Sequence, residues 1–123
     1  MAPTFEPKVV DDAVFDSVAE LFSLLSTPIR LKIIHALCQG EKNVSQLLAE
    51  IETTQPNMSQ HLSTLYRAGV LGKRRDSTQI YYRLQSDRIA TLCRVVCTQV
   101  AGELQTTAAQ TEPLQQMQLD KAA

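Results

Sequence analysis

The sequence predicts a mainly α-helical domain with one small β-hairpin, an α+β arrangement. Apolar residues recur every three or four positions in segments between residues 10 and 68 and again after residue 86, as on amphipathic helices. Between these helices, residues 70–84 form two short β-prone runs. A chain of 123 residues, 44% of them hydrophobic, has room for one core. We therefore expect a flexible N-terminus (1–8), one domain (9–105) and a tail (106–123).

The first two helices are predicted from their apolar stripes and from the residues at their ends. The first lies within residues 10–25, where the stripe consists of Val10, Val14, Val18, Leu21, Phe22 and Leu25. The second follows Thr27, whose hydroxyl suits an N-cap, and begins with Pro28, which is favoured at the first helical position. It is expected to stop before Gly40.

Two further helices follow in close succession. Asn43 and Gln46 have the spacing of a capping box, which predicts a short helix with one buried side. After a turn at residues 52–53, Thr54 is a candidate N-cap, and the next helix should run to about Ala68 and end at Gly69. Two short helices joined by a tight turn are typical of a helix-turn-helix.

A hairpin and a last helix complete the domain. The two β-prone runs, residues 70–75 and 78–84, are separated by Asp76-Ser77, which predicts the hairpin turn, with the basic residues 73–75 at its tip. Ser86 can cap a last helix that carries an apolar stripe of Ile89, Leu92, Val96, Val100 and Leu104. After Gln105 the sequence has few core-forming residues, so we expect a frayed or disordered tail. This order of elements defines a winged helix-turn-helix.

The charges are unevenly distributed along the chain. The net charge is −1, but the segment from Arg67 to Arg88 holds six basic and two acidic residues, a local net charge of +4. Residues 1–26 hold five acidic residues and one basic residue, a local net charge of −4. Such polarity is expected of a protein that presents one face to nucleic acid and another face elsewhere.

The fourth predicted helix has a polar outer face. If Met58, Leu62 and Leu65 point to the core, the opposite side carries short polar residues. Asn and Gln can form paired hydrogen bonds with adenine, and the free amides at a helix start favour phosphate. A polar face can also simply meet water, but a basic hairpin directly after this helix favours DNA binding. The predicted DNA contacts are Thr54, Gln55, Asn57, Ser59, Gln60, Ser63, Thr64, Arg67, Lys73, Arg74 and Arg75.

Four motifs stand out within residues 19–84: Leu24–Ile33, Val44–Leu47, Gln55–Leu65 and Ala68–Leu71. Together they resemble the ArsR/SmtB family of transcriptional repressors. The resemblance implies a winged fold with five helices, in which the first and last helices pair to form a homodimer. It also implies a repressor that binds double-stranded DNA at an inverted repeat and leaves it when an inducer acts.

The best-known metal sites of the family are absent from the corresponding positions. Residues 41–47 contain neither of the cysteines that the arsenic-sensing type carries in its third helix. The four positions that correspond to the zinc ligands of the last helix are Ser86, Arg88, Gln99 and Gly102, which cannot bind zinc.

Three cysteines remain as candidate sensor thiols. Cys93 and Cys97 share one face of the last helix, and Cys38 lies near the end of the second helix. In persulfide-sensing relatives the two cysteines correspond to His35 and Ala101, one helical turn from Cys38 and Cys97. We expect an inducer that modifies these thiols, a reactive sulfur species such as a persulfide or an oxidant, and no required cofactor. The alternatives are As(III) or another thiophilic metal ion bound by all three thiols, and cysteines that serve only as small apolar residues.

Other classes of protein have little support in the sequence. No apolar run reaches the ~18 residues of a membrane span, and the N-terminus lacks the features of a signal peptide. An odd number of cysteines argues against a secreted disulfide framework, so we expect a cytoplasmic protein with reduced thiols. No catalytic motif is present, and we expect no enzyme activity. The remaining rival is a winged-helix module that binds another protein and has no inducer.

Overall fold

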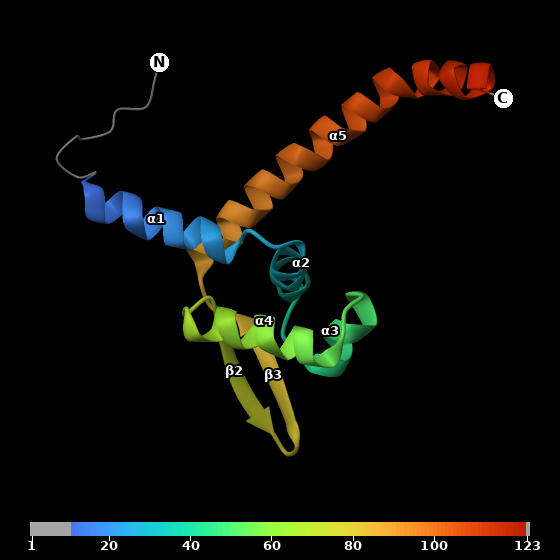
Figure 1. Cartoon of the computed structure of the whole chain (residues 1–123). Helices are drawn as coiled ribbons and strands as arrows, with labels where there is room; N and C mark the ends of the chain where they lie inside the picture. Colours follow the sequence, from blue (N-terminus) through green and yellow to red (C-terminus); the bar gives the residue numbers. More distant parts are fainter. Residues whose placement is uncertain (1–10, 123) are drawn as a thin grey trace.

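The computed structural model describes residues 11–122, with side chains described for residues 11–107. The expected flexible segment 1–8 lies outside the described residues. In chain order the elements are α1 (Asp12–Leu24), α2 (Pro28–Leu37), β1 (Lys42–Asn43), α3 (Val44–Glu50), α4 (Gln55–Arg67), β2 (Leu71–Asp76), β3 (Gln79–Leu84) and α5 (Asp87–Ala122). The hairpin of β2 and β3 lies at one end of the molecule, while α1 and α5 lie at the other (Figure 1). Five helices and a small sheet confirm the predicted fold class.

The helix starts follow the predicted caps. The hydroxyls of Thr27 and Thr54 accept hydrogen bonds from the amides of Arg30 and Asn57, both at 3.2 Å. The side chain of Ser86 likewise accepts from the amide of Ile89 at 3.3 Å. The cap of α1 was not predicted. It is Asp11, whose side chain accepts a hydrogen bond from the amide of Val14, and the helix starts at the next residue. Each cap satisfies a first-turn amide that has no partner within its helix.

The sheet contains a strand that the sequence did not predict. The strand order is β1-β3-β2, all antiparallel, with Lys42 opposite Tyr82 and Asn43 opposite Tyr81. Two residues are too short a run to give an alternating apolar pattern, so the sequence offers no signal for β1.

Asn43 belongs both to the sheet and to the start of α3. Its backbone lies in β1 opposite Tyr81, and its side chain accepts a hydrogen bond from the amide of Gln46 at 2.9 Å. The Gln46 side chain accepts one in return from the amide of Asn43, also at 2.9 Å, which completes the predicted capping box. The sheet and the first helix of the helix-turn-helix therefore meet without a connecting loop.

The hairpin turn lies one residue later than predicted. It consists of residues 77 and 78, since Asp76 ends β2 and pairs with Gln79 of β3. Ser77 supplies the left-handed backbone of the turn with φ 58°. Lys73, Arg74 and Arg75 accordingly lie along β2 and not at the tip of the hairpin.

The core lies among α2, α3, α4, the base of the hairpin and the first turns of α5. Its fully buried large side chains are Ile33, Ile34, Leu47, Met58, Leu62, Leu65, Leu71 and Ile89. The predicted inner face of α4 is thus confirmed. Because this core fixes α4 from within, the opposite side of α4 is left facing outward.

The outer helices contribute far less to this core. α1 has no buried residue, and large apolar side chains on α1 and α5 remain exposed: Val14, Phe15, Val18, Phe22, Val95, Val96, Val100 and Leu104. α5 also continues to Ala122, whereas the sequence analysis expected the helix to end near Gln105 and a frayed or disordered tail to follow. The segment after Gln105 has few core-forming residues, but it is rich in Ala, Gln, Leu, Met and Lys, which favour a helix even without a core to pack against.

Within residues 11–122 no helix has both the length and the apolar character needed to cross a bilayer.

Candidate nucleic-acid interface and thiol cluster

The outer face of α4 is exposed and mostly polar. Of the residues predicted to contact DNA, all those on or just before α4 are exposed except Thr64, which is half-buried. Thr64 donates its hydroxyl hydrogen to the backbone oxygen of Gln60 at 3.0 Å, and the side-chain Nδ2 of Asn57 donates to the hydroxyl of Thr53 at 2.9 Å. Within residues 11–107 the exposed side-chain amide of Gln60 forms no hydrogen bond, so it is available to a ligand.

The three basic residues of β2 do not share one environment. Alternation along the strand places Lys73 and Arg75 on one side of the hairpin and Arg74 on the other. The ammonium group of Lys73 lies 4.3 Å from the centre of the Tyr66 ring, which ties it to the last turn of α4. Lys73 and Arg75 therefore extend the outer face of α4, and Arg74 does not.

Arg74 is held by Glu41, a partner that the sequence analysis missed. Its Nε donates to the two carboxylate oxygens of Glu41 at 2.9 and 3.0 Å, and its guanidinium lies 4.8 Å from the centre of the Tyr81 ring. The hydrogen bond from Arg74 holds the pKa of Glu41 below its usual value, and the same bond raises the pKa of Arg74. This pairing neutralises much of the charge that the sequence assigned to a DNA contact. Only the fold brings residues 41 and 74 together.

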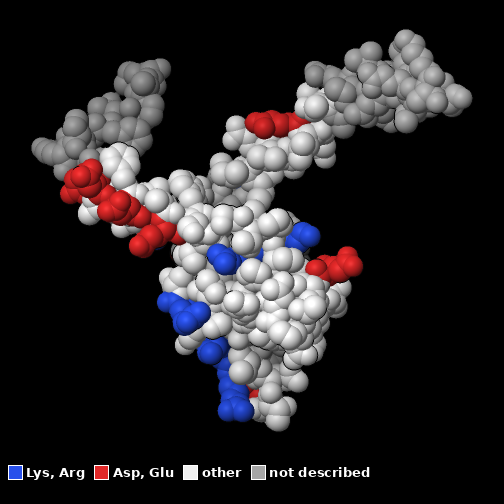
Figure 2. All heavy atoms as spheres, viewed as in Figure 1, with Lys and Arg blue, Asp and Glu red and all other residues white. Residues whose placement is uncertain are grey.

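Charge is segregated across the molecule. Figure 2 shows the acidic side chains of α1 at one end and basic side chains over the lower part of the molecule, including the hairpin. The acidic residues of α1 are Asp12, Asp16 and Glu20, with Asp11 just before the helix, and all are exposed. The electrostatic field therefore favours approach of a polyanion at the α4 and hairpin end.

All three cysteines line one hollow between α2 and α5. It has a volume of about 400 Å³, and its wall includes Cys38, Cys93, Cys97 and His35. Cys93 is buried, while Cys38 and Cys97 are exposed, and none of the three forms a disulfide. The predicted placement of Cys38 and Cys97 on facing elements is thus found, with Cys93 as a third member.

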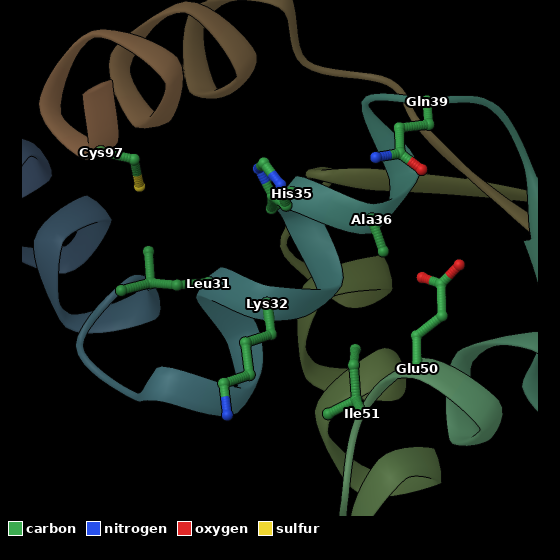
Figure 3. Close-up of a pocket in the computed structure, with 8 residues that line it drawn as sticks. All are labelled: Leu31, Lys32, His35, Ala36, Gln39, Glu50, Ile51 and Cys97. Atoms are coloured by element: carbon green, nitrogen blue, oxygen red, sulfur yellow. The ribbon is translucent and has the colours of Figure 1, made fainter. Parts of the chain in front are cut away.

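A second hollow, of about 490 Å³, opens beside the first and shares His35 and Cys97 with it. Figure 3 shows Cys97 reaching from α5 toward Leu31 and His35 of α2, with Glu50 and Ile51 on the far side. Cys97 is thus the thiol that both hollows expose.

The buried Cys93 is held in its neutral thiol form. Burial raises the pKa of Cys93, and the neighbouring Cys97 and Cys38 raise it further, since two adjacent thiolates repel one another. A thiol with a raised pKa is a poor nucleophile at neutral pH. Within residues 11–107, no three His, Cys, Asp or Glu side chains are grouped so that they could hold a metal ion.

Comparison with known proteins places the chain among bacterial regulators. The family model described as "Bacterial regulatory protein, arsR family" matches residues 27–73. A "Biofilm growth-associated repressor" of Agrobacterium fabrum is 43% identical over 75 residues, which are 61% of this chain and 64% of that protein, slightly less than two thirds of its length.

Two solved structures share the fold. The transcriptional repressor BigR from Xylella fastidiosa is 37% identical, with a TM-score of 0.64 over 68% of this chain and 85% of that one. The homodimeric winged helix-turn-helix DNA-binding domain of Mb0332 from Mycobacterium bovis is 30% identical, with a TM-score of 0.62 over 84% of this chain and 91% of that one.

Proposed function

The chain belongs to the ArsR/SmtB family of bacterial regulatory proteins, and from this premise we propose that it is a sequence-specific DNA-binding repressor released by chemistry at its cysteines. The observation that carries the DNA-binding part is the exposed polar face of α4 beside the exposed Lys73 and Arg75 of β2. The relatives are regulators, in keeping with a role in binding and not in catalysis.

In this proposal α4 enters the major groove. Its outward amides, those of Gln60 and Asn57, reach base edges, while Arg67 and the amides near Thr54 contact phosphates. Arg75 and Lys73 of the hairpin follow the neighbouring backbone. Arg74 contributes less, because Glu41 occupies its guanidinium.

The apolar faces of α1 and α5 support a homodimer. Eight large apolar side chains on these helices are exposed in the single chain, an arrangement that favours burial against a second copy. The Mycobacterium bovis relative is described as homodimeric. Such a dimer would place two α4 helices in successive major grooves, roughly 34 Å apart, on an inverted repeat.

The release step is assigned to the three thiols. A persulfide, R–S–SH, would transfer its outer sulfur to the exposed Cys97, giving Cys97–S–SH and the thiol R–SH. A second thiol of the cluster, that of Cys38, would then attack Cys97–S–SH at the Cys97 sulfur, forming a disulfide and releasing H₂S. This bond would tie α2 to α5 and change the position of α4 relative to the dimer helices.

Mass spectrometry of the protein with and without an organic persulfide tests this step, alongside release from DNA. We expect a mass loss of two hydrogens in a Cys38–Cys97 linked peptide and parallel loss of DNA binding. Cys38→Ser and Cys97→Ser should both block release. Unchanged release in both variants would remove the thiol mechanism.

As(III) is the second candidate inducer, because three thiols line one hollow; in the described residues they are not grouped so as to hold an ion, so this inducer would have to draw them together. The same assay with As(III) separates the two inducers, since three-thiolate binding would also require Cys93. The salt dependence of DNA affinity distinguishes this repressor from a winged-helix module that binds only proteins. Affinity for DNA that does not fall as the salt concentration rises would count against the DNA-binding role.

A further inference from the structure

The guanidinium group of Arg30 joins three helices. From the first turn of α2, its Nε donates a hydrogen bond to Nδ1 of His61 on α4 at 3.2 Å. Its Nη1 donates to the backbone oxygen of Leu24 at 3.2 Å and to that of Ser23 at 3.4 Å. Both carbonyls belong to the last turn of α1, and that of Ser23 also accepts from the amide and the hydroxyl of Ser26 at 3.2 and 2.7 Å. One side chain thus connects the end of α1 with α4.

His61 is the residue of α4 that receives this connection. It is half-buried and lies between Gln60, which is exposed, and Leu62, which is fully buried. The core contacts of α4 set its general orientation, and a bond at this position adds a direct link to α1 that adjusts the rotation of α4 and so the direction of the Gln60 side chain.

We propose that Arg30 and His61 are positioning residues that couple α1 to α4, and that protonation of His61 breaks the coupling and weakens DNA binding. This inference rests on the proposed DNA-binding function. It adds a proton-sensitive contact that is separate from the cysteines.

The hydrogen bond between Arg30 and His61 depends on pH and is lost when the imidazole is protonated. Nδ1 of His61 accepts a hydrogen bond only while it carries no proton, which requires the neutral ring with its proton on Nε2. A proton on Nδ1 removes the acceptor and sets a second positive charge beside Arg30. Burial first, and the charge of Arg30 second, hold the pKa of His61 below its usual value. The contact is therefore complete above the ordinary histidine pKa and is lost as the pH falls through the lowered one.

Few other charged groups surround this contact. From α2 the charge acting on His61 is that of Arg30. From α1, Glu20 lines the shallow hollow that Arg30 shares with Ser23 and Thr64. On α4 itself, Arg67 is exposed and its Nε donates to the backbone oxygen of Ser63 at 3.4 Å. The chain has two histidines, and the other, His35, is exposed on α2 and offers a matched control.

The test compares DNA affinity from about pH 7.5 to about pH 5.5 for the wild-type protein, His61→Asn and His35→Asn. The probe is a duplex selected by the wild-type protein from a randomised library at the upper pH. Asparagine can place its side-chain oxygen near the position of Nδ1, so it can accept from Arg30 but cannot take up a proton. We expect wild type and His35→Asn to lose affinity several-fold per protomer over this range, a loss that would approach about tenfold only at lower pH for a difference of about one pKa unit, and His61→Asn to lose little.

Parallel loss of affinity in wild type and His61→Asn would overturn the inference while leaving DNA binding intact. If the wild-type protein selects no duplex at the upper pH, the proposed function fails, and this inference fails with it. Should His61→Asn not fold, NMR titration of His61 in wild type decides: we expect a lower pKa in the DNA complex than in the free protein, and an equal pKa overturns the proposal. Arg30→Lys keeps the charge but cannot bridge His61 and the α1 carbonyls, so it should weaken DNA binding at both pH values.

Discussion

The part of the molecule built from α2, α3, α4 and the hairpin differs from the part built from α1 and α5 in how it is stabilised. The first contains nearly all of the buried apolar side chains, and the second leaves eight large ones exposed. α1 has no buried residue at all. The DNA-facing part is therefore stabilised within one chain, whereas the outer helices need a surface that one chain does not supply.

Because of this difference, the folding of each chain and the association of two chains should respond to different substitutions. Substitutions in the core should change the folding of each chain, and substitutions on the outer stripe should change association. Substitutions on the polar face of α4 should change neither, only DNA binding. The predictions that follow begin with the largest expected effect.

Leu62→Ala removes a fully buried side chain from the inner face of α4. We expect a loss of about 2–5 kcal/mol in the free energy of unfolding, because a cavity remains where the side chain was. Urea denaturation followed by circular dichroism measures it. Ser63→Ala, at the neighbouring exposed position, should change the midpoint little; equal effects would contradict the assigned orientation of α4.

Phe22→Asp places a charge on the exposed apolar stripe of α1, where Phe22 is 55% exposed. We expect the dimer to weaken by about 2–4 kcal/mol, roughly 30- to 700-fold in Kd, measured by analytical ultracentrifugation. Asp16→Asn changes the charge on the opposite, polar side of the same helix and should leave association unchanged. An unaltered dimer in Phe22→Asp would exclude this face from the interface.

Gln60→Ala removes an outward amide from α4. We expect a loss of about 1–3 kcal/mol in affinity for the selected duplex and almost none for random DNA, measured by fluorescence anisotropy. Equal losses on both duplexes would defeat its role in reading bases.

Arg75→Ala and Arg74→Ala form a matched pair on β2. We expect Arg75→Ala to weaken binding to all DNA and to reduce the salt slope by about one, because it removes one phosphate contact. Arg74→Ala should reduce the slope less, since Glu41 already accepts from its Nε at 2.9 and 3.0 Å. A larger effect of Arg74→Ala would show that the ion pair opens on DNA.

Thr54→Ala removes the cap of α4, whose hydroxyl accepts from the amide of Asn57 at 3.2 Å. We expect a modest loss of about 1 kcal/mol in the free energy of unfolding, measured by urea denaturation. Thr54→Ser, which keeps the hydroxyl, should restore most of it.

Local sequence signals predicted the helices and their caps well. Thr27, Asn43, Thr54 and Ser86 lie where they were expected, because a capping residue and the amide it satisfies are separated by two or three positions. The inner face of α4 followed from helical periodicity alone.

Contacts between distant segments were not predictable in the same way. The pairing of Glu41 with Arg74, and that of Arg30 with His61, joins residues more than thirty positions apart. β1 exists only because β3 passes beside it. The gathering of Cys93 with Cys38 and Cys97 in one hollow likewise needed the packing of α5 on α2.

The double placement of Asn43, in β1 and at the cap of α3, affects the DNA that the protein can accept. Because β1 pairs with β3 of the hairpin and passes directly into α3 with no loop between them, we expect the hairpin to move together with the helix-turn-helix when it meets a duplex. The DNA must then change shape to fit the protein. DNA sequences differ in the energy required to bend the duplex or to narrow one of its grooves. In the proposed complex such a joint would select duplexes by their stiffness, at base pairs that no side chain touches.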